Sequence, residues 1–173
     1  MRIIHPFRFL FVLIVLSAAI YSCNRGDGTF GEPCINVICH NGQYTNEGAT
    51  CVCNCTPGYK GALCDTLRAA YFLGNYTCSS QSCTTSGFSS LVIHVTSNAY
   101  SLAKLDISNL HQAGGTTIAD IDSLDHSFTI PAQPLSGSTV SGSAILNGNT
   151  LTVTYIMANG STADTCTGVF VRQ

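Results

Sequence analysis

The stretch NGNTLTVTYIMANG, residues 147–160, decides the fold of the larger part of this chain. Apolar side chains recur within it at every second position, at Leu151, Val153, Tyr155 and Met157. Alternation with a period of two indicates a β-strand with one buried face. An Asn-Gly pair stands at each end, and such pairs are strong hairpin signals because both residues tolerate positive φ. The stretch therefore predicts a strand between two antiparallel neighbours.

The same alternation extends over most of the chain from residue 71 onward. Further runs contain Leu91, Ile93 and Val95, and then Ala103, Leu105 and Ile107. Residues rich in Gly, Pro, Asn and Ser, which favour turns, separate the runs at positions 97–98, 114–115 and 131–134. No stretch shows sustained helical periodicity, and the count is about eight strands, spaced as in antiparallel sandwiches and barrels.

Consecutive tight hairpins favour an up-and-down arrangement, and closure of eight strands into a barrel would remove exposed strand edges. The predicted fold class is therefore all-β, with a small disulfide-rich module followed by an antiparallel meander β-barrel over residues 71–173. A β-sandwich is the alternative.

The N-terminus has the layout of an export signal. Arg2 and Arg8 precede an apolar run over residues 9–20. This run is shorter than a typical membrane-spanning helix, and a charged segment followed by a short apolar one is typical of a signal peptide.

The run ends in Ile20-Tyr-Ser-Cys23. An aliphatic residue three positions before a cysteine, and a small residue directly before it, resemble the bacterial lipobox. The resemblance implies cleavage before Cys23 and acylation of that cysteine with fatty-acid chains such as palmitate. Residues 1–22 are thus predicted to be a lipoprotein signal peptide and residues 23–33 a flexible tether.

Charge excludes one class of partner. The formal net charge is −2, and removal of residues 1–22 leaves five Lys and Arg against nine Asp and Glu. No basic patch remains, so nucleic acid is not an expected partner.

Six of the ten cysteines lie in residues 34–64, which we name the cysteine-rich module. Export places these cysteines in an oxidising compartment, where clustered cysteines indicate a disulfide framework. A module of this size holds few apolar side chains and needs covalent bridges for stability. Residues 65–70 are expected to be a short connector.

The module resembles the EGF-like family through two patterns, Cys39-His40-Asn41-Gly42 and Cys53-x-Cys55-x-x-Gly58-Tyr59-x-Gly61-x-x-Cys64. The resemblance implies the disulfide pairs Cys34–Cys51, Cys39–Cys53 and Cys55–Cys64. The two glycines at positions 58 and 61 suit tight turns that require positive φ.

Some members of that family bind calcium through acidic residues before the first cysteine and a polar residue between the third and fourth. Here Asp27 and Glu32 are badly spaced, and only Val52 separates the third and fourth cysteines. No metal site and no cofactor are therefore predicted.

Three cysteines remain outside the module and the lipobox: Cys78, Cys83 and Cys166. In a closed meander the first and last strands are neighbours, so a bridge between Cys83 and Cys166 would latch the barrel. A bridge between Cys78 and Cys166 is the alternative. If Cys23 is acylated, one of the nine remaining thiols has no partner within the chain.

The β domain also resembles a domain common in lipoproteins of Bacteroidetes, which often follows EGF-like repeats and has no established activity. The resemblance rests on FLGNY at residues 72–76 and FTIPAQ at residues 128–133. Together with the module and the lipobox, it identifies the chain as similar to a Bacteroidetes-type lipoprotein with a lipocalin-like β domain.

Catalytic patterns are scarce. His94 falls on the polar face of its strand, and His111 and His126 stand near turns, so each is expected to be solvated or loosely packed. Asp120 and Asp122 are expected at a solvated strand end. No nucleophile motif, phosphate loop or histidine-rich metal motif is present, and the chain is predicted not to be an enzyme.

The sequence therefore favours an exported, lipid-anchored protein of the cell envelope, with a structural or adhesive EGF-like module and a non-catalytic binding domain. The expected location is the outer membrane, facing the periplasm or the surface, with secretion as the alternative. The expected partners are the membrane and an unidentified protein, glycan or small apolar ligand. The alternative function is a lipocalin-like carrier of a small apolar ligand inside the barrel.

Overall fold

A computed structural model describes residues 36–47, 50–85, 91–123 and 126–173. The predicted signal peptide and tether, with Cys23 and Cys34, lie outside the described residues. Within them, no helix is both long enough and apolar enough to cross a membrane.

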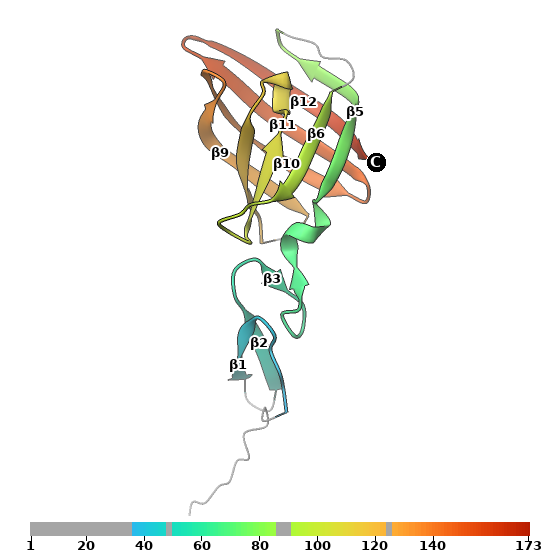
Figure 1. The fold of residues 1–173 in the computed structure, drawn as a ribbon, viewed down its shortest axis with the longest axis vertical. Helices are drawn as coiled ribbons and strands as arrows, with labels where there is room; N and C mark the ends of the chain where they lie inside the picture. Colours follow the sequence, from blue (N-terminus) through green and yellow to red (C-terminus); the bar gives the residue numbers. More distant parts are fainter. Residues whose placement is uncertain (1–35, 48–49, 86–90, 124–125) are drawn as a thin grey trace, which may run out of the picture. The chain divides into compact units, whose positions relative to one another are not determined.

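Eight antiparallel strands form a closed barrel (Figure 1). In chain order they are β5 (Gly74–Cys83), β6 (Val92–Ser97), β7 (Lys104–Ser108), β8 (Thr116–Ile121), β9 (Ser127–Leu135), β10 (Ser138–Asn147), β11 (Thr150–Asn159) and β12 (Thr162–Arg172). Each strand pairs with the next one in sequence, and β12 pairs with β5 to close the barrel. The predicted all-β meander barrel is confirmed, and the sandwich alternative is wrong.

Apolar side chains at every second position of the strands fill the interior of the barrel. The four apolar residues of β11 that the sequence placed on one face are all buried, as are Leu91, Ile93 and Val95 around and on β6. Five large aromatic side chains have no exposed surface: Phe72, Tyr76, Phe128, Tyr155 and Phe170. The rings of Phe72 and Phe128 meet edge to face, with centroids 5.4 Å apart. The interior is a packed core.

The turn predicted at residues 131–134 is wrong. Both prolines of that segment lie inside β9, and the hairpin turn follows at Ser136 and Gly137, where φ is 48° and 84°. Proline lacks the backbone donor that a central strand needs, which is why the segment was interpreted as a turn.

Gln133 compensates for the missing backbone donors. Backbone pairing between β8 and β9 is limited to Asp120–Thr129 and Ile121–Phe128. Beyond that point the Gln133 side chain accepts a hydrogen bond from the Ile118 amide at 2.8 Å and donates one to the Ile118 carbonyl at 2.6 Å. A side-chain amide thus takes the place of a peptide group in the sheet.

The buried phenol of Tyr76 links β5 and β12, the first and last strands of the barrel. The Tyr76 hydroxyl donates to the Phe72 carbonyl at 2.8 Å and accepts from Arg172 Nε at 3.0 Å. The Arg172 guanidinium also donates to the carbonyl of Tyr71. Burial raises the pKa of Tyr76, although Arg172 opposes the shift.

Two small sheets lie in and directly after the cysteine-rich module. Strands β1 (Gly42–Glu47) and β2 (Thr50–Cys55) pair with each other, and β3 (Tyr59–Lys60) pairs with β4 (Thr66–Leu67). Gly58 and Gly61 both have φ of 96°, the left-handed conformation expected of them.

Disulfides join Cys39 to Cys53 and Cys55 to Cys64, the two pairs that the family resemblance implies for these cysteines. Cys51 is also disulfide-bonded, and its expected partner lies outside the described residues.

Residues 65–70 are more than a connector. Thr66 and Leu67 form β4, and the next four residues form a short 3-10 helix, η1 (Arg68–Tyr71). Ala69 of that helix is fully buried in the same apolar cluster as the barrel core. The barrel core therefore begins before the expected boundary at residue 71.

Candidate functional site

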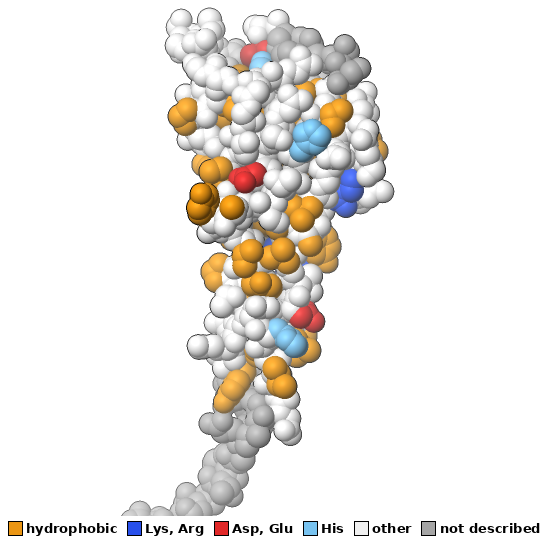
Figure 2. All heavy atoms as spheres, in the orientation of Figure 1, with side chains coloured by type: hydrophobic (Ala, Val, Ile, Leu, Met, Phe, Trp, Pro, Cys, Tyr) orange, Lys and Arg blue, Asp and Glu red, His pale blue; other side chains and the backbone are white. Residues whose placement is uncertain are grey.

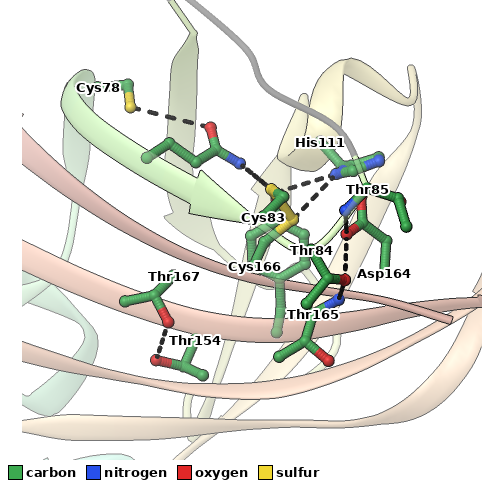
Figure 3. The surroundings of a disulfide bond; sticks show 12 residues. Cys78, Cys83, Thr84, Thr85, His111, Thr154, Asp164, Thr165, Cys166 and Thr167 are labelled. Carbon is green, nitrogen blue, oxygen red and sulfur yellow. Dashed lines mark hydrogen bonds between the residues drawn. A yellow bond between two sulfur atoms is a disulfide. The ribbon is translucent and has the colours of Figure 1, made fainter.

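The seam between β5 and β12 carries the most chemically distinctive group of side chains (Figure 3). Cys83 and Cys166 stand directly opposite each other in the strand register and form a disulfide, with their Cα atoms 4.1 Å apart. Cys78 is a free cysteine. Of the two bridges that the sequence left open, the structure contains Cys83–Cys166.

A β-bulge sets which side chains of β5 point inward. The register shifts between Val169 and Phe170, so that Ser79 has no partner residue on β12. Cys78 and Cys83 are five positions apart, and simple alternation would place them on opposite faces. The extra residue brings Cys78, Gln81 and Cys83 to the same side, where all three are partly buried.

Gln81 connects this row to the rest of the cluster. Its Nε2 donates to the Tyr155 hydroxyl at 2.8 Å and contacts Cys83 Sγ at 3.4 Å. Its Oε1 lies 3.9 Å from Cys78 Sγ. Burial raises the pKa of Cys78 and raises that of Tyr155 to about 12, so both groups keep their protons at neutral pH.

His111 lies beside the disulfide, on the 3-10 segment η2 (Leu110–Gln112). Its Nδ1 is 3.1 Å from the Tyr155 hydroxyl and 3.8 Å from Cys166 Sγ. The rings of His111 and Tyr155 meet nearly at a right angle, with centroids 5.7 Å apart. The expectation of a solvated or loosely packed His111 is wrong, because the ring is half-buried against these partners.

The Tyr155 hydroxyl accepts from Gln81 Nε2 and also lies within hydrogen-bond distance of His111 Nδ1. A phenol oxygen pairs with a protonated or an unprotonated ring nitrogen, and a neutral imidazole has one of each. Burial lowers the pKa of His111, and the nearby Asp164 carboxylate opposes the shift without cancelling it. The ring is therefore neutral at pH 7.

Asp164 anchors the chain that leaves β5. Its Oδ1 accepts from the Thr84 hydroxyl at 2.8 Å and from the Thr85 amide at 2.9 Å. The Thr84 hydroxyl in turn accepts from the Thr165 amide at 3.1 Å. Asp164 is only 8% exposed, so these bonds offset the cost of burying its charge. Sequence reasoning missed Asp164, because a single acidic residue in an otherwise alternating strand carries no motif.

A pocket of about 260 Å³ opens beside this cluster. It is lined by Thr85, His111, Ser138, Met157, Asn159, Thr162, Ala163 and Asp164. Its lining combines polar side chains with Met157 and Ala163.

The other residues singled out from the sequence lie away from the seam cluster. His94 is exposed, as expected, and its Nδ1 lies 2.7 Å from Asn75 Oδ1. Asp120 pairs with Lys104 at 2.6 Å, and Asp122 accepts from the Thr129 hydroxyl at 3.1 Å. His126 is exposed. The contacts of His94, Asp120 and Asp122 lie at the barrel surface.

One group among the described residues has the geometry to hold a metal ion. The sulfur atoms of Cys83 and Cys166 and a ring nitrogen of His111 all lie within 4.8 Å of one another. In the disulfide form the two sulfurs are bonded to each other and cannot act as thiolate ligands. Comparisons with protein-family models, curated proteins and solved structures found no match for this chain.

Proposed function

We propose that the chain is an exported, non-catalytic binding protein of the cell envelope. An acylated Cys23 anchors it to the membrane, the EGF-like module acts as a stapled spacer or adhesive element, and the barrel presents a rigid outer surface to a partner. The observation that carries this proposal is the filled barrel: its interior is occupied by the chain's own side chains, and ligand contacts are left to the exterior.

The packing supports a scaffold more than a carrier. Carrier barrels of eight strands keep an internal cavity for one small ligand. Here Phe128, Tyr155 and Phe170 are fully buried within one continuous apolar cluster. Pockets for drug-sized ligands usually measure about 300–1,000 Å³ and are mostly apolar. The seam pocket, at about 260 Å³, is smaller.

The outer surface is suited to contact with an uncharged partner. Charged residues make up only 9% of the chain, and Figure 2 shows one face on which charged side chains are few. Large apolar side chains are exposed at separate positions of the barrel, among them Tyr100, Ile118, Ile145 and Ile156. Such a surface supports binding to a neutral protein or glycan more than binding to a polyanion.

Metabolic labelling with an alkyne-tagged palmitate analogue in a bacterial host tests the anchor. The full-length chain is expected in the membrane fraction with the label. Cys23→Ser is expected to lose both, and Cys78→Ser, which changes a free cysteine of the barrel, is expected to keep both. Equal labelling of Cys23→Ser and the unmodified chain would contradict lipid anchoring at this residue.

Titration with a fluorescent fatty acid tests the carrier alternative. The unmodified chain is expected to show no saturable binding, because fully buried side chains such as Phe128 fill the interior. Saturable binding of one molecule per unmodified chain would favour the carrier over the scaffold.

A further inference from the structure

The cluster at the barrel seam contains three side chains with soft or borderline metal-ligand atoms. Cys83 and Cys166 supply two sulfurs and His111 supplies a ring nitrogen, all within 4.8 Å of one another. We propose that these three residues form a redox-gated site for a thiophilic divalent ion such as zinc. The site is closed while the disulfide exists and is assembled when a dithiol reductant opens it.

The distances fit a tetrahedral zinc site with little rearrangement. Zinc binds thiolate sulfur at about 2.3 Å and imidazole nitrogen at about 2.0–2.1 Å. A tetrahedral site therefore places the sulfur and the nitrogen about 3.6 Å from each other. His111 Nδ1 already lies 3.8 Å from Cys166 Sγ. The main movement required is separation of the two sulfurs to about 3.8 Å, the edge of the same tetrahedron.

The strand register permits that separation. Cys83 and Cys166 are directly opposed on β5 and β12, and their side chains share one face of the sheet. The backbone ladder extends from this pair towards Arg172 and continues into the hydrogen bond from the Thr84 amide to the Thr165 carbonyl. Side-chain rotation can therefore move the sulfurs apart without a change of register.

His111 is held ready as a ligand. The Tyr155 hydroxyl contacts the ring, and Gln81 donates a hydrogen bond to that hydroxyl in turn. The segment that carries His111 is fixed by Asn109, whose side chain donates to the Val92 carbonyl at 2.7 Å. These contacts place Nδ1 beside Cys166 Sγ before any ion binds. Because Tyr155 contacts the nitrogen that would ligate the metal, its hydroxyl must move off Nδ1 when the ion binds.

Three protein ligands leave the fourth position of a tetrahedral ion open. His111 and Asp164 both line the pocket of about 260 Å³ beside the seam. A water molecule or a small anionic ligand entering from this pocket could complete the coordination. The site would then resemble an open two-cysteine, one-histidine arrangement more than a closed structural site.

The chemistry balances with one external reagent. The Cys83–Cys166 disulfide takes up two electrons and two protons from a dithiol, which becomes a disulfide itself. Metal binding then releases the two thiol protons, because thiolates are the ligands. Oxidation of the two thiolates by a disulfide partner reforms the bridge and expels the ion. In either state the β5–β12 seam is held by a bond through the same two sulfurs.

Zinc titration of the full chain against a chromophoric chelator tests this proposal, with and without reduction by a phosphine. Reduction also frees the cysteines of the module, so the double variant Cys83→Ala/Cys166→Ala measures their background. The reduced unmodified chain is expected to bind one more equivalent of zinc than this variant. The oxidised chain is expected to bind none at the seam.

Variants of single residues identify the ligand set. His111→Ala is expected to lower the affinity for the extra zinc ion by about tenfold or more, since even outer-shell changes cost about 10–100-fold in metal affinity. His126→Ala removes an exposed histidine and is expected to bind as the unmodified chain does. Cobalt in place of zinc should give the charge-transfer absorption of two further thiolates, above the background of the double variant, only where the extra equivalent is present.

Two results would overturn the proposal. One is equal zinc binding by the reduced unmodified chain and the double variant. The other is an unchanged affinity in His111→Ala, which would mean that free thiolates bind zinc without the assembled site. Amide hydrogen exchange of β11 and β12 checks that each reduced variant keeps its barrel. If the double variant does not fold, the comparison of His111→Ala with His126→Ala decides alone.

Discussion

Among residues 36–64 whose side chains are described, only Gly58 and Cys64 are buried, whereas twenty-two side chains form one buried cluster centred on the barrel. The module compensates for its missing core with closely spaced disulfides. The barrel has one disulfide, placed where its first and last strands meet. The same covalent bond therefore does different work in the two regions: it replaces a core in one and closes a seam in the other.

Loss of one module bridge is expected to expose the most backbone amides. Cys55→Ser/Cys64→Ser removes a bridge worth about 2–4 kcal/mol from a region with almost no apolar core. We expect amides of β2 and β3 to lose protection in hydrogen exchange while β9 to β12 keep theirs. Cys78→Ser is the matched control, because it changes a free cysteine. Loss of barrel protection in the bridge variant would show that the two regions unfold together.

Truncation of a core aromatic should affect the barrel by a similar or slightly larger amount of free energy. Phe128 is fully buried and packs against Phe72, so Phe128→Ala is expected to lower the free energy of unfolding by about 3–5 kcal/mol. Tyr44→Ala removes a ring of the module that is 43% exposed and should cost far less. Urea denaturation followed by circular dichroism measures both. Equal effects would mean that the contrast between core and covalent stabilisation is wrong.

Removal of one buried hydroxyl should have a smaller and pH-dependent effect. Tyr76→Phe removes the hydrogen bonds to Phe72 and Arg172 and is expected to cost about 1–3 kcal/mol at neutral pH. Tyr100→Phe, at a position 97% exposed, should be neutral.

The pKa of Tyr76 is raised in the folded protein, so the unfolded chain loses its proton first as the pH rises above about 10. The stability contributed by this hydroxyl is thus fully present below that pH and is lost above it. We expect the difference between Tyr76→Phe and the unmodified chain to shrink in urea titrations at increasingly alkaline pH. A constant difference up to pH 11 would contradict the raised pKa.

Local patterns predicted what is decided locally. Alternation in β11 and around β6 identified the buried residues, because the face of a strand depends on neighbouring positions only. The Asn-Gly pairs marked turns for the same reason: β10 ends at Asn147 and β11 at Asn159. The closed barrel followed from the number of strands and the short connections.

The seam cluster could not be predicted in the same way. His111 and Cys166 are separated by 55 positions and meet only because the chain folds into a closed barrel. The bulge at Ser79 has no clear sequence signal, and without it Cys78 and Cys83 would lie on opposite faces of β5. The residue pair at the seam disulfide therefore stayed open until the register was known.

The turn prediction for the proline segment of β9 was wrong for a related reason. Gln133 contacts Ile118 from fifteen positions away, and this long-range bond allows a strand where the local sequence favours a turn. A bond on the barrel surface thus does locally what the disulfides do in the module: it holds two segments together where ordinary pairing is missing.

Gln133→Leu should therefore have the smallest effect of the set, confined to the β8–β9 edge. It leaves the amide and the carbonyl of Ile118 to water, and because the site is exposed, the expected cost is about 0.5–1.5 kcal/mol. Gln133→Glu keeps an acceptor for the Ile118 amide but has no donor for the carbonyl. Its stability should therefore lie between those of Gln133→Leu and the unmodified chain. Exchange of the Ile118 amide should speed up in the order Gln, Glu, Leu, while β11 amides stay unchanged. The same exchange rate in all three proteins would mean that another group satisfies this edge.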